Sequence, residues 1–428
     1  MSIEAFTTGR GAGRRQSYHA SLTPIPAAGA PAQAAVAATP GPAAAAAALG
    51  FPVQASRFVP PNWPFQPLPP PNGVSPFRYA LSRLLSAPDV QRITAAGSMV
   101  VHSVGDTGDY RGRQQDFVAE LMMADANDLP DERKPAFFYH LGDVVYFAGD
   151  IDRYGDNFYE TYKTYPGFIV SIPGNHDCQP DDPQDGTVDL NKVPLDGWVR
   201  NFMSPDSSRL GSLKTGAGRT QLDLPNVYWT FTTPFATFIG LFSNVGETEG
   251  EIHQDQLDWF KSELAAADPA LALVVAVHHP PFSGDTEHSG STQVYHYLFD
   301  SFAAVKRYPD LILSGHVHNY QRFTHMVQTA NGQAQIPCLV AGAGGYTRLG
   351  KLHKIGGRYP HAPLQLGPDL TLEQYDQNNF GFLRLEFSRT QITGTYISAP
   401  YSLASEPTGQ AADSFAVDLV AKSVTTIA

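Results

Sequence analysis

Two histidines in the second half of the chain have the spacing of metal ligands. His316 and His318 follow the apolar run from Leu311 to Leu313, where a buried strand is expected to end. Residues two apart on an extended strand point to the same side, so both imidazoles can approach one ion. The pair alone does not establish a metal site, because most histidines are structural or lie at the surface.

Four further clusters of polar residues also follow apolar, strand-like runs. In open α/β sheets the functional groups gather where the strands end, so the five clusters together can build one site. Carboxylate, amide, imidazole and phenolate groups suit Fe, Mn and Zn, whereas Ca and Mg sites rarely use histidine. Taken singly, Asp106 and Asp143 are equally consistent with turn residues. The four clusters are Gly105-Asp106, Gly142-Asp143 with Tyr146, Gly174-Asn175-His176-Asp177 and His278-His279.

In this order the clusters resemble the motif series of the calcineurin-like metallophosphoesterase superfamily. Tyr146 after Gly142-Asp143 and the run from Gly315 to Arg322 are similar to its purple acid phosphatase branch. The resemblance covers roughly Ser98 to Tyr396. It implies an α/β fold, a four-layer α/β/β/α sandwich, and a hydrolase that acts on phosphate esters.

The resemblance also implies a dinuclear centre with Fe³⁺ and a divalent ion, which is Fe²⁺, Zn²⁺ or Mn²⁺. A carboxylate between two ions holds them about 3.5–4 Å apart, which suits in-line displacement at phosphorus. The family pattern of His, any residue, then Pro selects His278 over His279, which leaves His279 a supporting role. Tyr146 needs to lose a proton to bind an ion, which Fe³⁺ favours; otherwise it is a packing residue. The implied ligands are Asp106, Tyr146 and His318 for one ion, Asn175, His278 and His316 for the other, and Asp143 between them.

Two histidines look like the non-ligand histidines of the family. His176 lies inside a matched motif, whereas His288 matches only by its distance after His278, and a solvated loop residue is the alternative for it. An imidazolium can stabilise a phosphoryl transition state or protonate the leaving oxygen. Arg322 and the loop Gly342-Ala343-Gly344-Gly345 either line the pocket or have structural roles.

The leading hypothesis is hydrolysis of phosphate monoesters by attack of metal-bound hydroxide. A phosphodiesterase or nucleotide pyrophosphatase on the same metal core is one alternative. A non-catalytic interaction scaffold is the other, and the intact set of ligand positions argues against it. The sequence leaves the choice between monoesters and diesters open.

The composition argues against two classes of binding partner, nucleic acids and membranes. The 428 residues carry a net charge of -12 and 16% charged side chains, and no basic stripe indicates a nucleic-acid or anionic-membrane partner. No apolar stretch approaches the roughly 20 residues that span a bilayer, so we expect no membrane partner. Cys178 and Cys338 are expected to be free thiols. The absence of a continuous apolar leader favours a cytoplasmic location, with export as the alternative.

The pattern along the chain divides it into four segments. Residues 1–73 are rich in Ala and Pro and are expected to be disordered, because they cannot bury enough apolar surface. Residues 74–97 are a connecting arm, residues 98–400 form the catalytic domain, and residues 401–428 are a C-terminal tail. The expected elements include strands at 99–104, 136–141, 168–172 and 271–277, helices at 114–125 and 254–266, and a closing hairpin at 380–387 and 391–397.

Overall fold

A computed structural model describes residues 68–108, 113–178, 194–204, 219, 221–243, 250–402 and 407–427, with the backbone of 181–182 and 187–188. All of them lie in one compact unit, Pro40–Ala428. Residues 1–67, most of the segment predicted to be disordered, lie outside the described residues, so the structure does not test that prediction for them. Residues 68–73 pack on the fold, because Leu68 is partly buried against the core and Gly73 N–H donates to the Pro225 carbonyl over 2.8 Å.

The first half of the chain alternates strands with helices. The aliphatic run before Asp106 forms a strand whose residues beyond Ser98 are all buried, as a strand covered on both faces requires. The elements of the first half are β1 (Arg78–Ala80), α2 (Ala87–Ala96), β2 (Ser98–Val104), α3 (Gln114–Asp128), β3 (Phe137–His140), β4 (Phe168–Ser171), β5 (Asp181–Asp182), β6 (Thr187–Val188) and α4 (Asp196–Phe202). Short helical turns lie at η1 (Leu81–Arg83), η2 (Asp131–Arg133), η3 (Ile151–Arg153), η4 (Gly155–Tyr159) and η5 (His176–Cys178).

The second half adds two helices and most of the strands. Helix α5 buries Leu257, Phe260 and Leu264, which recur at helical spacing, so the predicted helix is confirmed at its predicted bounds. The elements are β7 (Trp229–Thr232), β8 (Ala236–Leu241), α5 (Gln254–Ala266), β9 (Ala272–Val277), α6 (Thr292–Val305), β10 (Leu311–Ser314), β11 (Tyr320–Thr329), β12 (Gly332–Ala341), β13 (Leu364–Gln365), β14 (Leu370–Asp376), β15 (Phe380–Ser388), β16 (Gln391–Ala399), β17 (Gln410–Asp418) and β18 (Ser423–Thr426).

The strands form two large sheets. The nine-stranded sheet has the order β1-β7-β8-β9-β10-β12-β11-β14-β13, and the seven-stranded sheet has the order β18-β17-β16-β15-β2-β3-β4. Strands β8, β9, β10 and β12 are parallel neighbours in the first sheet, and β2, β3 and β4 are parallel neighbours in the second. Parallel neighbours end at the same edge of a sheet, which is where loops can converge on one site.

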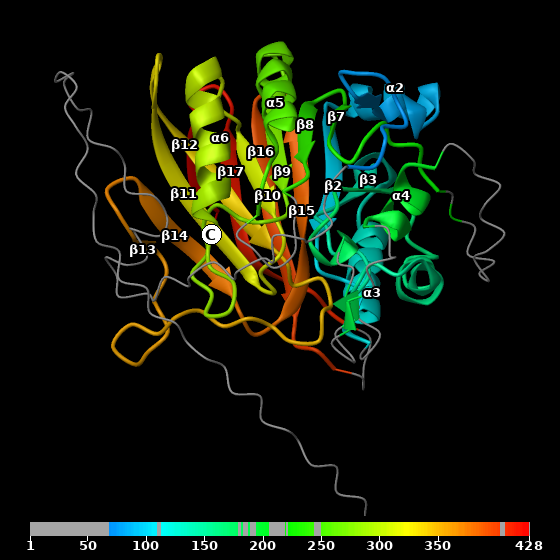
Figure 1. Ribbon diagram of the computed structural model, residues 1–428. Helices are drawn as coiled ribbons and strands as arrows, with labels where there is room; N and C mark the ends of the chain where they lie inside the picture. Colours follow the sequence, from blue (N-terminus) through cyan, green and yellow to red (C-terminus); the bar gives the residue numbers. More distant parts are fainter. Residues whose placement is uncertain are drawn as a thin grey trace, which may run out of the picture. The chain divides into compact units, whose positions relative to one another are not determined.

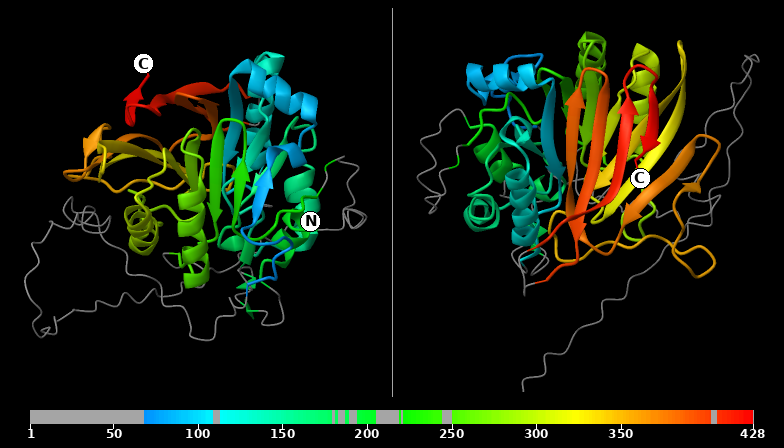
Figure 2. Two further views of the ribbon diagram at one scale, coloured as in Figure 1. Left: turned by 90° about the horizontal axis from the view of Figure 1, so that it is seen from above. Right: turned by 180° about the vertical axis from the view of Figure 1, so that it is seen from behind.

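The two sheets pack face to face through aromatic side chains. The ring of Phe137 lies 5.0 Å from that of Phe231, and the rings of Phe238 and Phe387 are 5.3 Å apart. Helices α5 and α6 cover the outer face of the nine-stranded sheet, and α3 lies against the seven-stranded sheet (Figures 1 and 2). The predicted four-layer α/β/β/α arrangement is confirmed. No helix among the described residues is long and apolar enough to cross a membrane.

Two predicted boundaries differ from the structure. The segment assigned to a C-terminal tail contributes β17 and β18 to the seven-stranded sheet, and the arm at 74–97 contributes β1 and α2. The first three residues of β17 are exposed, so its alternation of apolar and polar residues is short. Strand β1 has only three residues and joins β7 through its backbone, which leaves little pattern in the sequence. Cys178 and Cys338 are not joined by a disulfide, as predicted, and both side chains are buried.

Candidate metal centre

The predicted ligands all follow strand ends at the same edge of the two sheets. The seven-stranded sheet supplies four of the seven in the loops after β2, β3 and β4, and the nine-stranded sheet supplies three after β9 and β10. Asp106, Asp143 and His316 have positive φ angles of 60°, 52° and 65°. These left-handed conformations are uncommon for residues other than glycine and cluster at functional sites, because the surrounding fold has to impose them.

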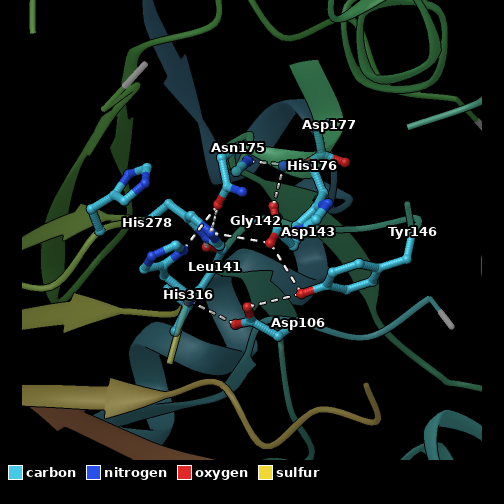
Figure 3. A network of polar contacts seen from close by, with 12 residues as sticks. Asp106, Leu141, Gly142, Asp143, Tyr146, Asn175, His176, Asp177, His278 and His316 are labelled. Atoms are coloured by element: carbon cyan, nitrogen blue, oxygen red, sulfur yellow. Dashed lines mark hydrogen bonds and ion pairs between the residues drawn. The ribbon is translucent and has the colours of Figure 1, made fainter. Parts of the chain in front are cut away.

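One group of potential ligand atoms surrounds the Tyr146 hydroxyl. Tyr146 Oη lies 3.2 Å from Asp106 Oδ1, 3.0 Å from Asp143 Oδ2 and 3.1 Å from His318 Nε2. Figure 3 shows the phenol directed toward the two carboxylates. His318 Nε2 in turn lies 3.5 Å from Asp106 Oδ1. The structure therefore brings together the residues predicted to bind the first ion.

A second group surrounds the side-chain carbonyl of Asn175. Its Oδ1 lies 3.1 Å from His278 Nε2 and 2.9 Å from His316 Nδ1. His278 Nε2 also lies 3.3 Å from Asp143 Oδ2. Ligand atoms of Asp143, His278 and His316 all lie within 4.8 Å of one another. Asp143 thus belongs to both groups.

Backbone contacts hold these side chains in place. His278 Nδ1 contacts the Leu141 carbonyl at 2.8 Å, which directs Nε2 toward Asn175 and Asp143. The other carboxylate oxygen of Asp143 accepts from His176 N–H at 2.8 Å, and Asp106 Oδ2 accepts from His316 N–H at 2.9 Å. Each carboxylate therefore has one oxygen fixed by the backbone and presents the other to the centre.

His279 has the supporting place predicted for it. Its Nδ1 lies 2.8 Å from Ser243 Oγ, and its ring packs 4.3 Å from the ring of His316. It therefore contacts the ligand candidate His316. The rings of His278 and His279 lie 5.3 Å apart, and both pack against the ring of His316.

Burial and charge act together on the titratable groups. Burial raises the pKa of Asp106 to about 8, although His278 opposes this rise. Burial would also raise the pKa of Asp143, but the charges of His278 and His176 outweigh it and lower the pKa. Burial lowers the pKa of His278, whereas Asp143 outweighs it and raises the pKa to about 9. Burial therefore favours the neutral form of Asp106, whereas Asp143 and His278 each favour the charged form of the other.

The hydroxyl of Tyr146 provides a test of whether cations fit. One hydroxyl proton can be donated to one acceptor, yet two carboxylate oxygens and an imidazole nitrogen lie within 3.2 Å of Tyr146 Oη. Both carboxylates are fully buried, and polar groups crowded together without complete pairing are costly in a protein interior. A metal ion among these oxygen and nitrogen atoms removes that cost. The donor atoms are carboxylate, phenol and imidazole groups, which suit Fe, Mn or Zn, the same metals that the sequence indicated.

Comparison with known families identifies the fold. A family model described as calcineurin-like phosphoesterase matches residues 99–320, which is more than half of the 428 residues. The chain belongs to the calcineurin-like phosphoesterase family. The predicted superfamily is therefore confirmed, and the prediction of a phosphoesterase hydrolase is confirmed at the level of the family.

Individual relatives of this phosphoesterase are distant. It is 27% identical over 167 residues to purple acid phosphatase 22 of Arabidopsis thaliana, covering 38% of this chain and 34% of the relative. It is 30% identical over 100 residues to purple acid phosphatase 21 of the same plant, covering 23% of this chain and 22% of the relative. The matches thus span about a third or less of these relatives. They confirm the predicted resemblance to the purple acid phosphatase branch.

A solved structure of PhoD shares the fold of this phosphoesterase. The TM-score is 0.53 at 13% sequence identity, and the match covers 78% of this chain and 72% of PhoD. At this identity the likeness concerns the fold alone. It agrees with the arrangement of two large sheets between helices.

The two predicted catalytic histidines lie beside the phosphoesterase centre. His176 Nδ1 contacts the Phe147 carbonyl at 2.6 Å, and its ring lies 4.4 Å from that of Tyr146. The ring of His288 lies 4.6 Å from that of His316 and 5.5 Å from that of His318. His288, which was selected only by its sequence distance after His278, therefore does lie near the ligand candidates.

Sequence analysis missed Tyr346, which follows the Gly-rich loop. Its ring lies 4.3 Å from that of Tyr146 and 4.3 Å from that of His318, and its N–H donates to the Asp106 carbonyl over 3.0 Å. The glycines permit this approach, because a Cβ at Gly344 would collide with the carbonyl oxygen of Gly105. The sequence did contain a signal for Tyr346, because this residue directly follows a Gly-rich loop that begins where a buried strand ends.

Arg322 has a structural role instead of lining the pocket. Its guanidinium forms two hydrogen bonds of 2.6 and 2.9 Å to the Asp413 carboxylate, and both side chains are almost fully buried. The Tyr320 hydroxyl donates to the same carboxylate over 2.7 Å. Strand β11 of the nine-stranded sheet is thereby tied to β17 of the other sheet.

Proposed function

We propose that this chain hydrolyses phosphate monoesters with the help of two metal ions. The observation that carries the proposal is the position of Asp143, whose Oδ2 lies 3.0 Å from Tyr146 Oη and 3.3 Å from His278 Nε2. A carboxylate shared by two groups of ligand atoms supports one dinuclear centre rather than two separate sites. Membership of the phosphoesterase family supports a phosphate ester as the substrate.

The two groups define which residues would hold the ions. When bound, the two ions supply Lewis acidity toward phosphoryl oxygens and make a water molecule nucleophilic at neutral pH. Burial, together with the carboxylates of Asp143 and Asp106, raises the pKa of Tyr146 well above its usual value, so a phenolate there requires a strongly charged ion. This favours Fe³⁺ beside a divalent Fe²⁺, Zn²⁺ or Mn²⁺. Asp106, Tyr146 and His318 would hold one ion, Asn175, His278 and His316 the other, and Asp143 both.

The two histidines outside the ligand set would donate a proton to the leaving group and stabilise negative charge in the transition state. The contact of 2.6 Å with the Phe147 carbonyl fixes one nitrogen of His176 and leaves Nε2 for the leaving oxygen. We assign to His176 the donation of a proton to that oxygen. His288 packs beside His316, so we assign to it stabilisation of the negative charge on the phosphoryl oxygens.

Metal analysis followed by a substrate panel tests the proposal. The full-length protein is loaded with iron and a divalent ion, its metal content is counted, and hydrolysis of phosphomonoesters, phosphodiesters and pyrophosphates is compared. Protein stripped with a chelator is the matched control. We expect two ions per chain and fastest hydrolysis of monoesters. Faster hydrolysis of diesters or pyrophosphates would contradict the substrate assignment, and a folded protein that binds no metal would contradict the whole proposal.

A further inference from the structure

A group of aromatic rings covers Tyr146 on the side of the centre that reaches solvent. The ring of Tyr146 is 1% exposed and lies 5.9 Å from that of Phe147, 4.4 Å from that of His176 and 4.3 Å from that of Tyr346. Phe147 and Tyr346 also contact each other edge to face, with ring centroids 5.9 Å apart. These three covering residues are each partly exposed. They therefore lie between the buried ligand candidate and the solvent.

Phe147 is linked to the proposed proton donor in two ways. Its carbonyl contacts His176 Nδ1 at 2.6 Å, and its ring lies 6.2 Å from the ring of His176. A group that receives a proton from His176 has to bring its oxygen within hydrogen-bond reach of that imidazole. A leaving group of several atoms bound at that imidazole can therefore reach the Phe147 ring.

Two basic side chains that follow Tyr346 in the described part of the chain are already engaged. Arg348, two residues after Tyr346, forms an ion pair of 3.2 Å with Glu287. The Lys351 ammonium donates to the Gln377 carbonyl and to Asn378 Oδ1. Neither side chain is therefore a spare cation for a second phosphate. The surroundings favour an uncharged leaving group that can lie against ring faces and edges.

We propose that Phe147 and Tyr346 form an aromatic platform that binds a flat ring in the leaving group of the substrate. The preferred substrates are then phosphate monoesters whose alcohol carries an aromatic ring. The preference rests on the proposed function only in requiring that the phosphoryl group binds at the metal centre. Stacked and edge-to-face ring pairs contribute beyond their buried area, and their usual strength corresponds to about a two- to tenfold preference for the aromatic ligand.

Binding of two phosphonates that differ only in ring type tests the platform without turnover. Benzylphosphonate and cyclohexylmethylphosphonate have similar size and the same anionic group, but only the first has a π face. Calorimetry with the metal-loaded, full-length protein should show benzylphosphonate binding about fivefold more tightly. Equal dissociation constants, or no binding of either compound, would overturn the proposal.

Variants assign the preference to the two rings. Phe147→Leu and Tyr346→Leu each keep an apolar side chain and should reduce the preference toward unity, whereas Tyr346→Phe should retain it. Tyr359→Leu is the matched control, because Tyr359 is 38% exposed, follows in the same segment and packs under Lys354. Metal content is counted for each variant. A preference that survives in both Leu variants would contradict the platform.

Hydrolysis separates this inference from the proposed function. Benzyl phosphate and cyclohexylmethyl phosphate release alcohols of similar reactivity, so their KM values report on the ring. A lower KM for benzyl phosphate supports the platform. Equal KM and kcat for the two esters would contradict the platform and leave the proposed function intact. Selective binding of benzylphosphonate without hydrolysis of either ester would contradict the proposed function and leave the platform intact.

Discussion

The buried ion pair between Arg322 and Asp413 allows a quantitative prediction for the stability of the fold. Both side chains are about 1–2% exposed, and Asp413 also accepts from the Tyr320 hydroxyl. Replacing Asp413 with Ala leaves a guanidinium buried without a counter-charge and removes the acceptor of Tyr320. Removal of one partner of such a pair usually costs about 3–5 kcal/mol. We therefore expect Asp413→Ala to lower the free energy of unfolding by about 4 kcal/mol.

Urea unfolding of the chelated protein, followed by intrinsic fluorescence, measures this change. Chelation removes the contribution of bound ligands to stability. The double variant Arg322→Met with Asp413→Leu should recover most of the loss, because well-packed apolar residues replace both charges. Asp196→Ala is the control, since Asp196 pairs with Arg200 in α4 at a partly exposed position and should cost less than about 1 kcal/mol. A loss below about 1 kcal/mol for Asp413→Ala would refute the reasoning.

The remaining predictions concern the proposed centre and the start of the chain. Asp143→Asn should lower the bound metal and abolish hydrolysis with little change in the unfolding curve of the chelated protein; full activity in that variant would contradict the assigned centre. Tyr146→Phe should remove a visible absorption band from protein reconstituted aerobically with iron, and should lower the free energy of unfolding by about 1 kcal/mol. If the iron-loaded variant has the same spectrum as the unchanged protein, Tyr146 is a packing residue and not a ligand. Removal of residues 1–67 should leave turnover unchanged, and a cleanly folded truncated protein without activity would show that this segment supports the site.

The sequence predicted the parts of the centre that depend on local pattern. Each cluster follows a buried strand, and a strand with its turn residues is recognisable within about ten residues. The strands before Asp106 and His278 and the helix at 254–266 were located in this way. His288 was found only through its distance from a matched motif, because its loop carries no periodic signal.

The missed features depend on contacts between distant segments. Arg322 and Asp413 are 91 residues apart, and no local pattern indicates that they meet between the two sheets. Tyr346 lies beside Tyr146 because glycines in the preceding loop pack closely against the backbone after β2. Strands β17 and β18 owe their place to pairing with β16 and with each other. Such placements follow from tertiary packing, which single-sequence patterns do not encode.

The division of the candidate ligands between the two sheets has a consequence for how the protein matures. Both groups of ligand atoms draw on both sheets, and the hydrogen bond between Leu141 and His278 joins positions 137 residues apart. A newly synthesised chain closes that long loop only after much of each sheet has formed, because distant pairings follow local ones. We therefore expect ion uptake to be a late event in maturation, and we expect ions bound by both groups to disfavour separation of the sheets.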